Sequence, residues 1–205
     1  MKTRITMVIG LLAVSGVANA DWSANIGFAS DYYYRGIFQH SSSASGGLDF
    51  EAGGFYAGTW AADVGDGLEV DLYGGFGFDI GENFSAYAGV TGYYYTGDFD
   101  DTYQEVNLGV AFFDLVSVDA AVGQYDNFDG PTLDYTYYNI TLEKNGFYGT
   151  YAGFSQDFEG EYFEFGYGTS VAEIDLGVSL IFSNEDLIGE EDEAIVFTIG
   201  KTFDL

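Results

Sequence analysis

The 205-residue chain contains no cysteine, one proline and only five lysine and arginine residues. Without cysteine it can form neither disulfide bonds nor a thiol-based active site. With so few basic residues it cannot neutralise phosphates, which excludes nucleic acid as a partner. After residue 20 no apolar run reaches the length of about 20 residues that a membrane-spanning helix needs. If the chain crosses a membrane, it therefore does so with strands.

The first twenty residues have the pattern of a cleaved signal peptide. Lys2 and Arg4 precede an apolar stretch from Ile5 to Val17, and Ala18-Asn19-Ala20 forms a small-residue cleavage site. We therefore divide the chain into a signal peptide over residues 1–20 and one domain over residues 21–205. The exported protein is predicted to lie in the cell outer membrane.

Glycine, aromatic and acidic residues dominate the remainder. The chain has 30 glycines, 19 phenylalanines and 18 tyrosines, a composition that favours strands over disorder. Removal of Lys2 and Arg4 leaves three basic residues against 33 acidic ones, a net charge of −30. Such a charge suits a surface bathed in salt or divalent ions, or an interior that prefers cations.

Alternating apolar and polar residues predict about twelve strands separated by turns. Long, mostly acidic connections alternate with short ones, as in outer-membrane barrels, and an even strand count places both termini at the short-turn, periplasmic end. The sequence therefore predicts an all-β fold, an antiparallel up-and-down transmembrane β-barrel. The expected strands cover residues 22–38, 44–52, 55 onward, 68–79, 84–96, 102–112, 116–125, 132–143, 147–156, 161–171, 174–182 and 194–204.

Side-chain parity assigns the two faces of the predicted wall. Through most of the chain odd-numbered positions are polar and face inward, whereas even-numbered ones such as Leu72, Val90 and Val106 face lipid. The parity changes late, so that Glu164 faces inward and Phe197 faces lipid. Lys201 then also lies on the outer face, where its long side chain can reach the membrane interface.

The first predicted strand carries Arg35, the only arginine after residue 20. A hairpin turning around Ser42 would place Arg35 opposite Asp49 and Tyr33 opposite Glu51. One interpretation is an ion pair on the inner wall that fixes the hairpin register. The other is a charged ring that filters solutes.

The aromatic residues of the outer face suggest membrane-interface contacts. We expect Trp22, Tyr32, Tyr34, Trp60 and Tyr94 to form an aromatic girdle there.

The predicted inner wall is strongly acidic. Seven inward carboxylates face a single arginine, which in a hydrated lumen gives a negative potential that attracts cations. The candidate pore-lining and selectivity residues are Asp31, Tyr33, Arg35, Asp49, Glu51, Glu69, Asp71, Tyr73, Glu105 and Asp119.

We predict no catalytic, cofactor or metal site. His40 and the serines that follow it, Ser41 to Ser43, are expected in one loop with no strand to position them as a nucleophile and base. The acidic loops, such as Asp98 to Asp101, lack the spacing of an EF-hand and are interpreted as solvated tips.

Several ordered motifs resemble one bacterial family. They are Ser30-Asp31-Tyr32, Arg35-Gly36 with Gln39, Gly46-Gly47-Leu48-Asp49, Gly54-Phe55-Tyr56-Ala57-Gly58-Thr59-Trp60, Leu68 to Gly75 and Tyr93-Tyr94-Tyr95. This first half of the domain is similar to the TorF-family porins, also called the Gcw_chp family of bacterial outer-membrane proteins. The resemblance implies a Gram-negative outer-membrane β-barrel of porin type with no established catalytic residues.

The predicted function is a porin-like channel for passive diffusion of small solutes, with a preference for cations. The alternative is a closed structural or interaction barrel that acts through its acidic extracellular loops. A lipid-hydrolysing barrel ranks third, and a periplasmic β-sandwich is the alternative fold. The expected partners are outer-membrane lipid and lipopolysaccharide, the barrel-assembly machinery, and small solutes or cations.

Overall fold

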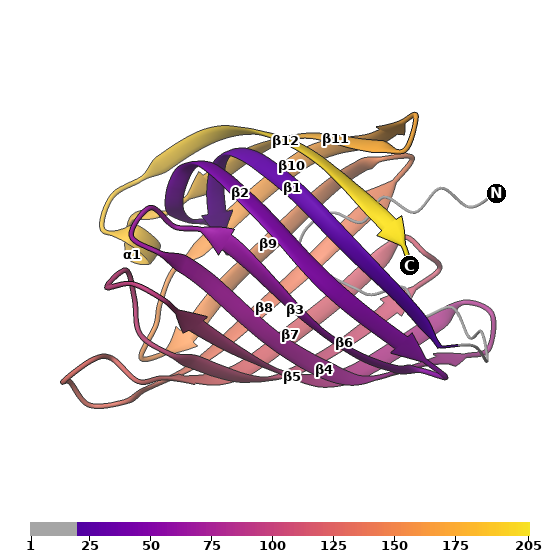
Figure 1. Ribbon diagram of the computed structural model, residues 1–205. Coiled ribbons are helices and arrows are strands. Elements are labelled where there is room, and N and C mark those ends of the chain that lie inside the picture. Colours follow the sequence, from indigo (N-terminus) through magenta and orange to yellow (C-terminus); the bar gives the residue numbers. More distant parts are fainter. Residues whose placement is uncertain (1–19) are drawn as a thin grey trace.

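A computed structural model describes residues 20–205, which form a closed barrel of twelve antiparallel strands (Figure 1). Each strand pairs with its neighbours in sequence, and β1 pairs with β12 to close the wall. The predicted up-and-down barrel is confirmed. The predicted signal peptide lies outside the described residues, except for Ala20.

The strand bounds from β3 onward agree with the predicted ones to within two residues. They are β1 (Asp21–Tyr34), β2 (Ile37–Ala52), β3 (Phe55–Asp63), β4 (Leu68–Ile80), β5 (Phe84–Tyr95), β6 (Tyr103–Phe112), β7 (Val116–Tyr125), β8 (Leu133–Lys144), β9 (Phe147–Gln156), β10 (Glu161–Val171), β11 (Ile174–Ser183) and β12 (Asp192–Asp204). A short helix, α1 (Glu185–Ile188), was not predicted. Across residues 20–205, no helix is long and apolar enough to cross a membrane.

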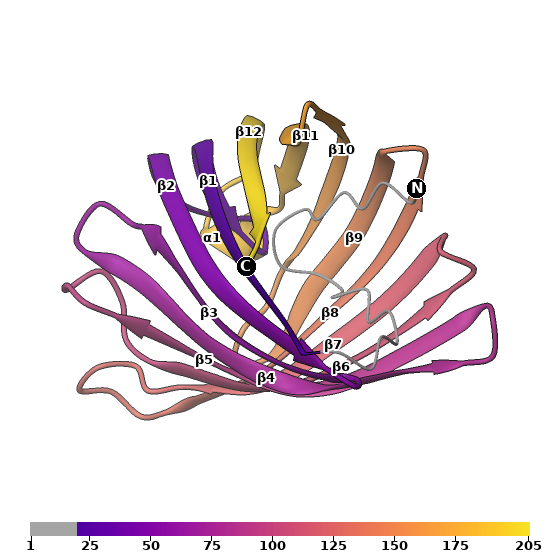
Figure 2. The ribbon, with the colours of Figure 1, turned by 45° about the vertical axis from the view of Figure 1, so that its right-hand side comes forward.

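The barrel has a turn end and a loop end (Figure 2). The short connections, such as Gly53-Gly54 and Asn145-Gly146, define the turn end. Both ends of the described chain meet there, because the Leu205 N–H donates a 2.9 Å hydrogen bond to the Trp22 carbonyl. The prediction that both termini lie at the short-turn end is confirmed.

The outer face is apolar, as the parity predicted. Leu72 is 53% exposed, Val90 59% and Phe197 60%, as expected of side chains that face lipid. Lys201 lies on this face near the turn end, where its Nζ is 3.0 Å from Glu173 in the β10–β11 turn. The salt bridge explains how a charged residue is tolerated at this position.

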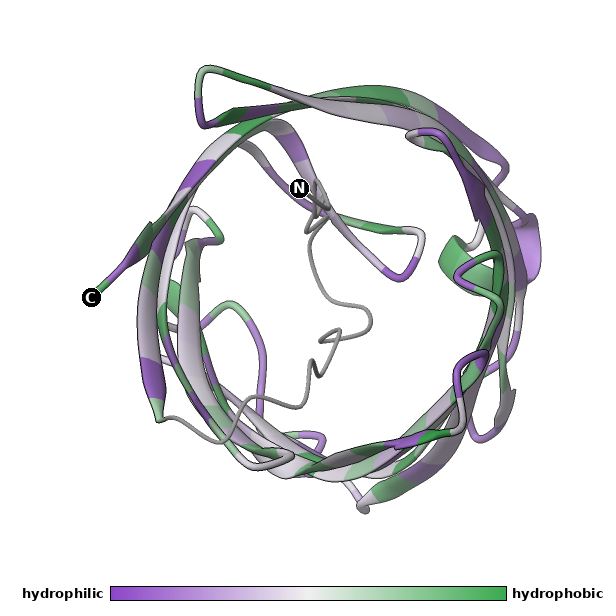
Figure 3. Cartoon of the chain, turned by 90° about the vertical axis from the view of Figure 1, so that its right-hand side faces the viewer, coloured by the Kyte–Doolittle hydropathy of each residue, from purple (hydrophilic) through white to green (hydrophobic). Residues whose placement is uncertain are grey.

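The tip of the β1–β2 hairpin leaves the barrel wall. The β1–β12 pairing ends at Ala29, and the β2–β3 pairing ends at Ser45. Between these positions the two strands pair only with each other, and their ribbon bends into the barrel interior (Figure 3). A left-handed residue, Ser42 with φ 62°, and a register shift between Tyr32 and Tyr33 accompany the bend. We call residues 30–44 the inward hairpin.

The predicted register of this hairpin is wrong. It turns at Arg35 and Gly36, whose φ angles of 51° and 79° fit a two-residue type I′ turn closed by Tyr34 and Ile37. Asp49 therefore lies opposite Ser23, and Glu51 lies opposite Asp21. Gly36 supplies the positive φ that this turn demands. The predicted turn around Ser42 gave this glycine no such role.

The bend also changes the predicted aromatic girdle. Tyr32 is 5% exposed and packs edge-on against Trp60, with ring centroids 5.8 Å apart, inside the barrel. Tyr34 likewise packs inside, against Tyr93. Trp60 lies in the wall strand β3 but faces inward, opposite the buried Asp71, so its predicted outer position is also wrong. Only Trp22 and Tyr94 remain as exposed members of the predicted set.

Candidate functional site

The tip of the inward hairpin contacts strands that lie far from it in the wall. The Gly36 carbonyl accepts a 2.5 Å hydrogen bond from Ser183 Oγ in β11. A Cβ atom added at Gly36 would lie 2.6 Å from the ring of Tyr162 in β10. Arg35 bonds Glu105 in β6. The tip therefore spans the interior of the loop-end half and narrows it.

Gly36→Ala is expected to loosen this tip. The alanine would adopt a positive φ and would also collide with Tyr162, so we expect a loss of roughly 1–3 kcal/mol in unfolding free energy. Gly81→Ala is the matched control, because Gly81 has φ 72° and nothing within 4 Å of the added Cβ. Urea unfolding in lipid vesicles measures both variants. Equal losses would show that the tip does not pack against Tyr162.

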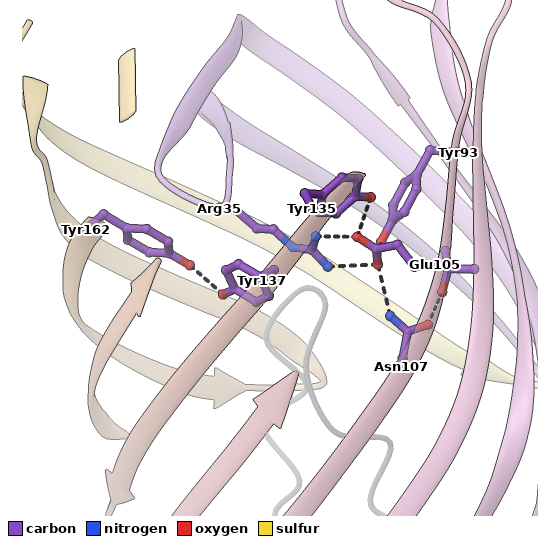
Figure 4. A network of polar contacts seen from close by, with 8 residues as sticks. Arg35, Tyr93, Glu105, Asn107, Tyr135, Tyr137 and Tyr162 are labelled. Atoms are coloured by element: carbon purple, nitrogen blue, oxygen red, sulfur yellow. Dashed lines mark hydrogen bonds and ion pairs between the residues drawn. The ribbon is translucent and has the colours of Figure 1, made fainter. Parts of the chain in front are cut away.

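Arg35 and Glu105 form the centre of the contact (Figure 4). The two terminal guanidinium nitrogens of Arg35, Nη1 and Nη2, donate to the two carboxylate oxygens of Glu105, with Nη2 2.9 Å from Oε2. The guanidinium also lies over the rings of Tyr137, 4.1 Å from the centroid, and Tyr34, 4.8 Å away. A bidentate pair between aromatic faces suits arginine and would not suit lysine.

Glu105 accepts further hydrogen bonds from the wall. Tyr135 Oη donates at 2.8 Å, Asn107 Nδ2 at 2.9 Å and Tyr93 Oη at 3.1 Å. The Glu105 side chain is 0% exposed, so these donors replace the water that its carboxylate has lost. The pair is thus a buried, fully hydrogen-bonded attachment point for the hairpin.

Two tyrosines of the hairpin make further attachments to carboxylates. Tyr32 Oη donates a 2.6 Å hydrogen bond to Glu69 in β4, which also accepts one of 2.9 Å from Tyr95. Tyr33 Oη donates at 2.6 Å to Asp192 at the start of β12. These bonds and the Arg35 pair hold the hairpin from several sides of the barrel.

Asp71 lies beside this network without joining it. It is 4% exposed, and its Oδ1 has no hydrogen-bond partner among the described residues. Its strand neighbours across the ladder are Trp60 in β3 and Tyr93 in β5.

The other predicted pore-lining residues lie apart from the Arg35 network. Asp49 accepts hydrogen bonds from Tyr73 Oη and from Asn25 Nδ2. Asp119 accepts one of 3.0 Å from Tyr87. Asp31 accepts one of 2.8 Å from Ser41 inside the hairpin, and Glu51 lies at the turn end. The structure thus brings Arg35 to Glu105 and not to Asp49.

Aromatic side chains fill part of the loop-end interior. Tyr135 stacks on Phe158 with centroids 5.0 Å apart, and Tyr103 stacks on Tyr125 at 4.3 Å. Tyr137 and Tyr162 are joined by a 2.9 Å hydrogen bond below the tip (Figure 4). The alternation of side chains had placed Tyr137, Tyr93 and Asn107 on the inner face. Nothing in the sequence indicated that they contact the ion pair of Arg35 and Glu105.

His40 and its serines are in β2 and not in a loop, which corrects the prediction. Ser41 Oγ donates to Asp31, and Ser43 Oγ donates to the Asp63 carbonyl at 2.7 Å. The His40 ring lies against Gly65 in the β3–β4 connection. In residues 20–205, no group of three or more histidine and acidic side chains is arranged to hold a metal ion.

Comparison with known proteins places the chain near one sequence family. The model of the family described as "Bacterial protein of unknown function (Gcw_chp)" matches residues 13–104. This range includes the inward hairpin and ends just before Glu105. The resemblance read from the ordered motifs is therefore confirmed at the level of this family model. No curated protein matches the sequence.

Solved structures share the fold. The outer-membrane channel COG4313 from Pseudomonas putida F1 aligns with 96% of this chain and all of its own, at 11% identity and a TM-score of 0.55. A structure from work on the in-meso crystallization of membrane proteins aligns with 90% of this chain and 84% of its own. Its identity is 8% and its TM-score 0.61. The fold is that of an outer-membrane β-barrel.

Proposed function

We propose that this protein is a porin-like outer-membrane channel for passive diffusion of small solutes and that it prefers cations. The observation that carries the proposal is the charge of the inner wall. Glu69, Asp71 and Glu105 are all buried near the hairpin, and Arg35 is the only basic residue among them. The negative potential of such a wall attracts cations and repels anions.

Other features support this assignment. The similar COG4313 structure is described as an outer-membrane channel. The Gcw_chp match is consistent with the TorF-type porin that the motifs suggested. The same proposal includes export by the signal peptide, insertion by the barrel-assembly machinery and contact with outer-membrane lipid and lipopolysaccharide. It requires no cofactor and no chemical step.

A closed structural or interaction barrel is the second candidate. The aromatic stacks of Tyr135 on Phe158 and of Tyr103 on Tyr125, together with the hairpin tip, occupy the loop-end interior. A barrel closed in this way would act through its acidic outer loops. The two candidates differ in whether ions pass.

Conductance in planar bilayers tests the proposal. Refolded protein lacking residues 1–20 is expected to give discrete current steps, and a KCl gradient is expected to give a cation-selective reversal potential. Charge drives the selectivity, so high ionic strength should weaken it. A silent bilayer, with folding verified by heat-dependent gel mobility, would reject the channel and favour the closed barrel. An anion-selective reversal potential would reject the cation preference.

A further inference from the structure

Asp71 presents an unusual electrostatic problem. Its Oδ1 is buried and receives no hydrogen bond from the described residues, although the residue is only 4% exposed. An ionised carboxylate without a partner is strongly unfavourable in such surroundings. Its environment therefore requires a proton, a water molecule or a cation that the protein itself does not supply.

The neighbouring charges do not solve this problem. The two terminal nitrogens of the Arg35 guanidinium already donate to Glu105. Glu69 is 0% exposed and accepts only neutral tyrosine hydroxyls. The remaining basic residues after residue 20 are Lys144 and Lys201, both at the turn end. This region therefore holds three buried carboxylates and only one guanidinium, which leaves an excess of negative charge.

The surroundings of Asp71 suit a cation. Trp60 and Tyr93 flank it in the adjacent strands, so that its carboxylate lies in a row between two aromatic side chains on the inner face. Aromatic faces attract cations that have lost water. Tyr34 Oη is the other buried side-chain oxygen without a partner in residues 20–205, and its ring lies 5.5 Å from that of Tyr93. Tyr93 therefore lies opposite Asp71 in the ladder and beside the ring of Tyr34.

We propose that Asp71 binds a small monovalent cation, such as K⁺, Na⁺ or ammonium, at the constriction formed by the inward hairpin. The inference rests on the proposed cation-preferring channel, for which it names the binding residue. A monovalent ion fits better than Ca²⁺, because Asp71 offers a single negative charge, whereas Ca²⁺ sites gather several protein carboxylate and carbonyl oxygens. Water from the lumen completes the shell of the monovalent ion.

Unfolding in two salts tests the site without requiring conduction. Thermal unfolding is followed in KCl and in N-methyl-D-glucamine chloride at equal ionic strength, because the large organic cation cannot enter the buried site. A ligand that binds only the folded state raises the unfolding temperature. The wild type should unfold a few degrees higher in KCl, and Asp71→Asn should lose this difference.

Glu164→Gln provides the matched control. Glu164 is also an inward carboxylate, but Tyr148 Oη already donates to it at 2.5 Å, so this variant should keep the KCl effect. Asp71→Asn removes a buried charge and should fold, and only its response to salt is compared. Equal unfolding temperatures of the wild type in both salts would overturn the proposal, since a proton or water at Asp71 gives no such difference.

Thallium in crystals provides an independent readout. Tl⁺ replaces K⁺ and scatters anomalously, so wild-type crystals grown with it should show a peak beside the Asp71 carboxylate and Asp71→Asn crystals should not. No peak at Asp71 in the wild type would overturn the site. If the bilayer stays silent but the KCl stabilisation and the Tl⁺ peak are both present, the channel is rejected and the cation site is kept. If the protein conducts but shows neither the KCl stabilisation nor the Tl⁺ peak, the cation site is rejected and the channel is kept.

Discussion

Replacement of residues 31–41 by an Asn-Gly turn is expected to leave the barrel closed and to raise its single-channel conductance several-fold. These residues belong to the part of β1 and β2 that pairs with neither β12 nor β3. Their removal therefore breaks no hydrogen bond between β1 and β12 or between β2 and β3. It removes the Arg35 guanidinium and the tyrosines that span the loop-end interior, so the lumen widens.

The same deletion should also strengthen cation selectivity. Without Arg35, the carboxylates of Glu69, Asp71 and Glu105 remain on the wall with no basic residue beside them. The measurement is the reversal potential of the deletion variant in the same KCl gradient as the wild type. A control that shortens the β7–β8 connection, residues 126–132, should change neither quantity if the hairpin is the constriction.

An unchanged conductance in the deletion variant would contradict this account. The aromatic stacks around Tyr135 and Phe158, which the deletion leaves in place, would then be the barrier. Loss of heat-dependent gel mobility would instead show that the hairpin is needed for the barrel to form. Both outcomes reject the hairpin as a removable constriction.

Strand-level features could be predicted from the sequence because each depends on local patterns. The period of two in side-chain polarity fixes the faces of β4 to β7, and turn residues fix their ends. Leu72 and Val90 are accordingly exposed on the outside, whereas Glu69 and Asp71 are buried inside. Antiparallel pairing between consecutive strands then follows from the short connections.

The inward hairpin could not be predicted in the same way. Parity assigns a residue to one face of a wall, and Tyr32 and Tyr34 belong to a segment that is no longer part of the wall. The Arg35-Gly36 pair offers a turn signal through its glycine, but a strand pattern continues on both sides of it. The contacts that hold the bend, such as that of Arg35 with Glu105, join residues far apart in the sequence.

The partner of Arg35 was hidden for a related reason. Glu105 is 70 residues away and belongs to the opposite part of the barrel, so no local spacing joins the two. Both residues were candidates for the inner wall, and only the three-dimensional closure brings them together. The predicted hairpin register placed Arg35 opposite Asp49 instead, and that expectation is wrong.

A double-mutant cycle on Arg35 and Glu105 is expected to give the largest change in stability. Removal of either partner leaves the other charge buried and unpaired, which typically costs about 3–5 kcal/mol. Arg35→Ala and Glu105→Ala should each lower the unfolding free energy by an amount of this order. Because the double variant leaves no unpaired charge, it should lose less than the sum, with a coupling energy of about 0.5–3 kcal/mol.

The cycle also separates the two interpretations of Arg35. If the ion pair only anchors the hairpin, both single variants should show lower stability and higher conductance. If Arg35 is instead part of a charged filter, Arg35→Ala should increase cation selectivity while the unfolding free energy, measured by urea in vesicles, stays unchanged. The Tyr135, Asn107 and Tyr93 bonds to Glu105 favour the anchoring role, because they fix the carboxylate that receives the guanidinium. If the losses of unfolding free energy in the two single variants simply add up in the double variant, the anchoring role is contradicted.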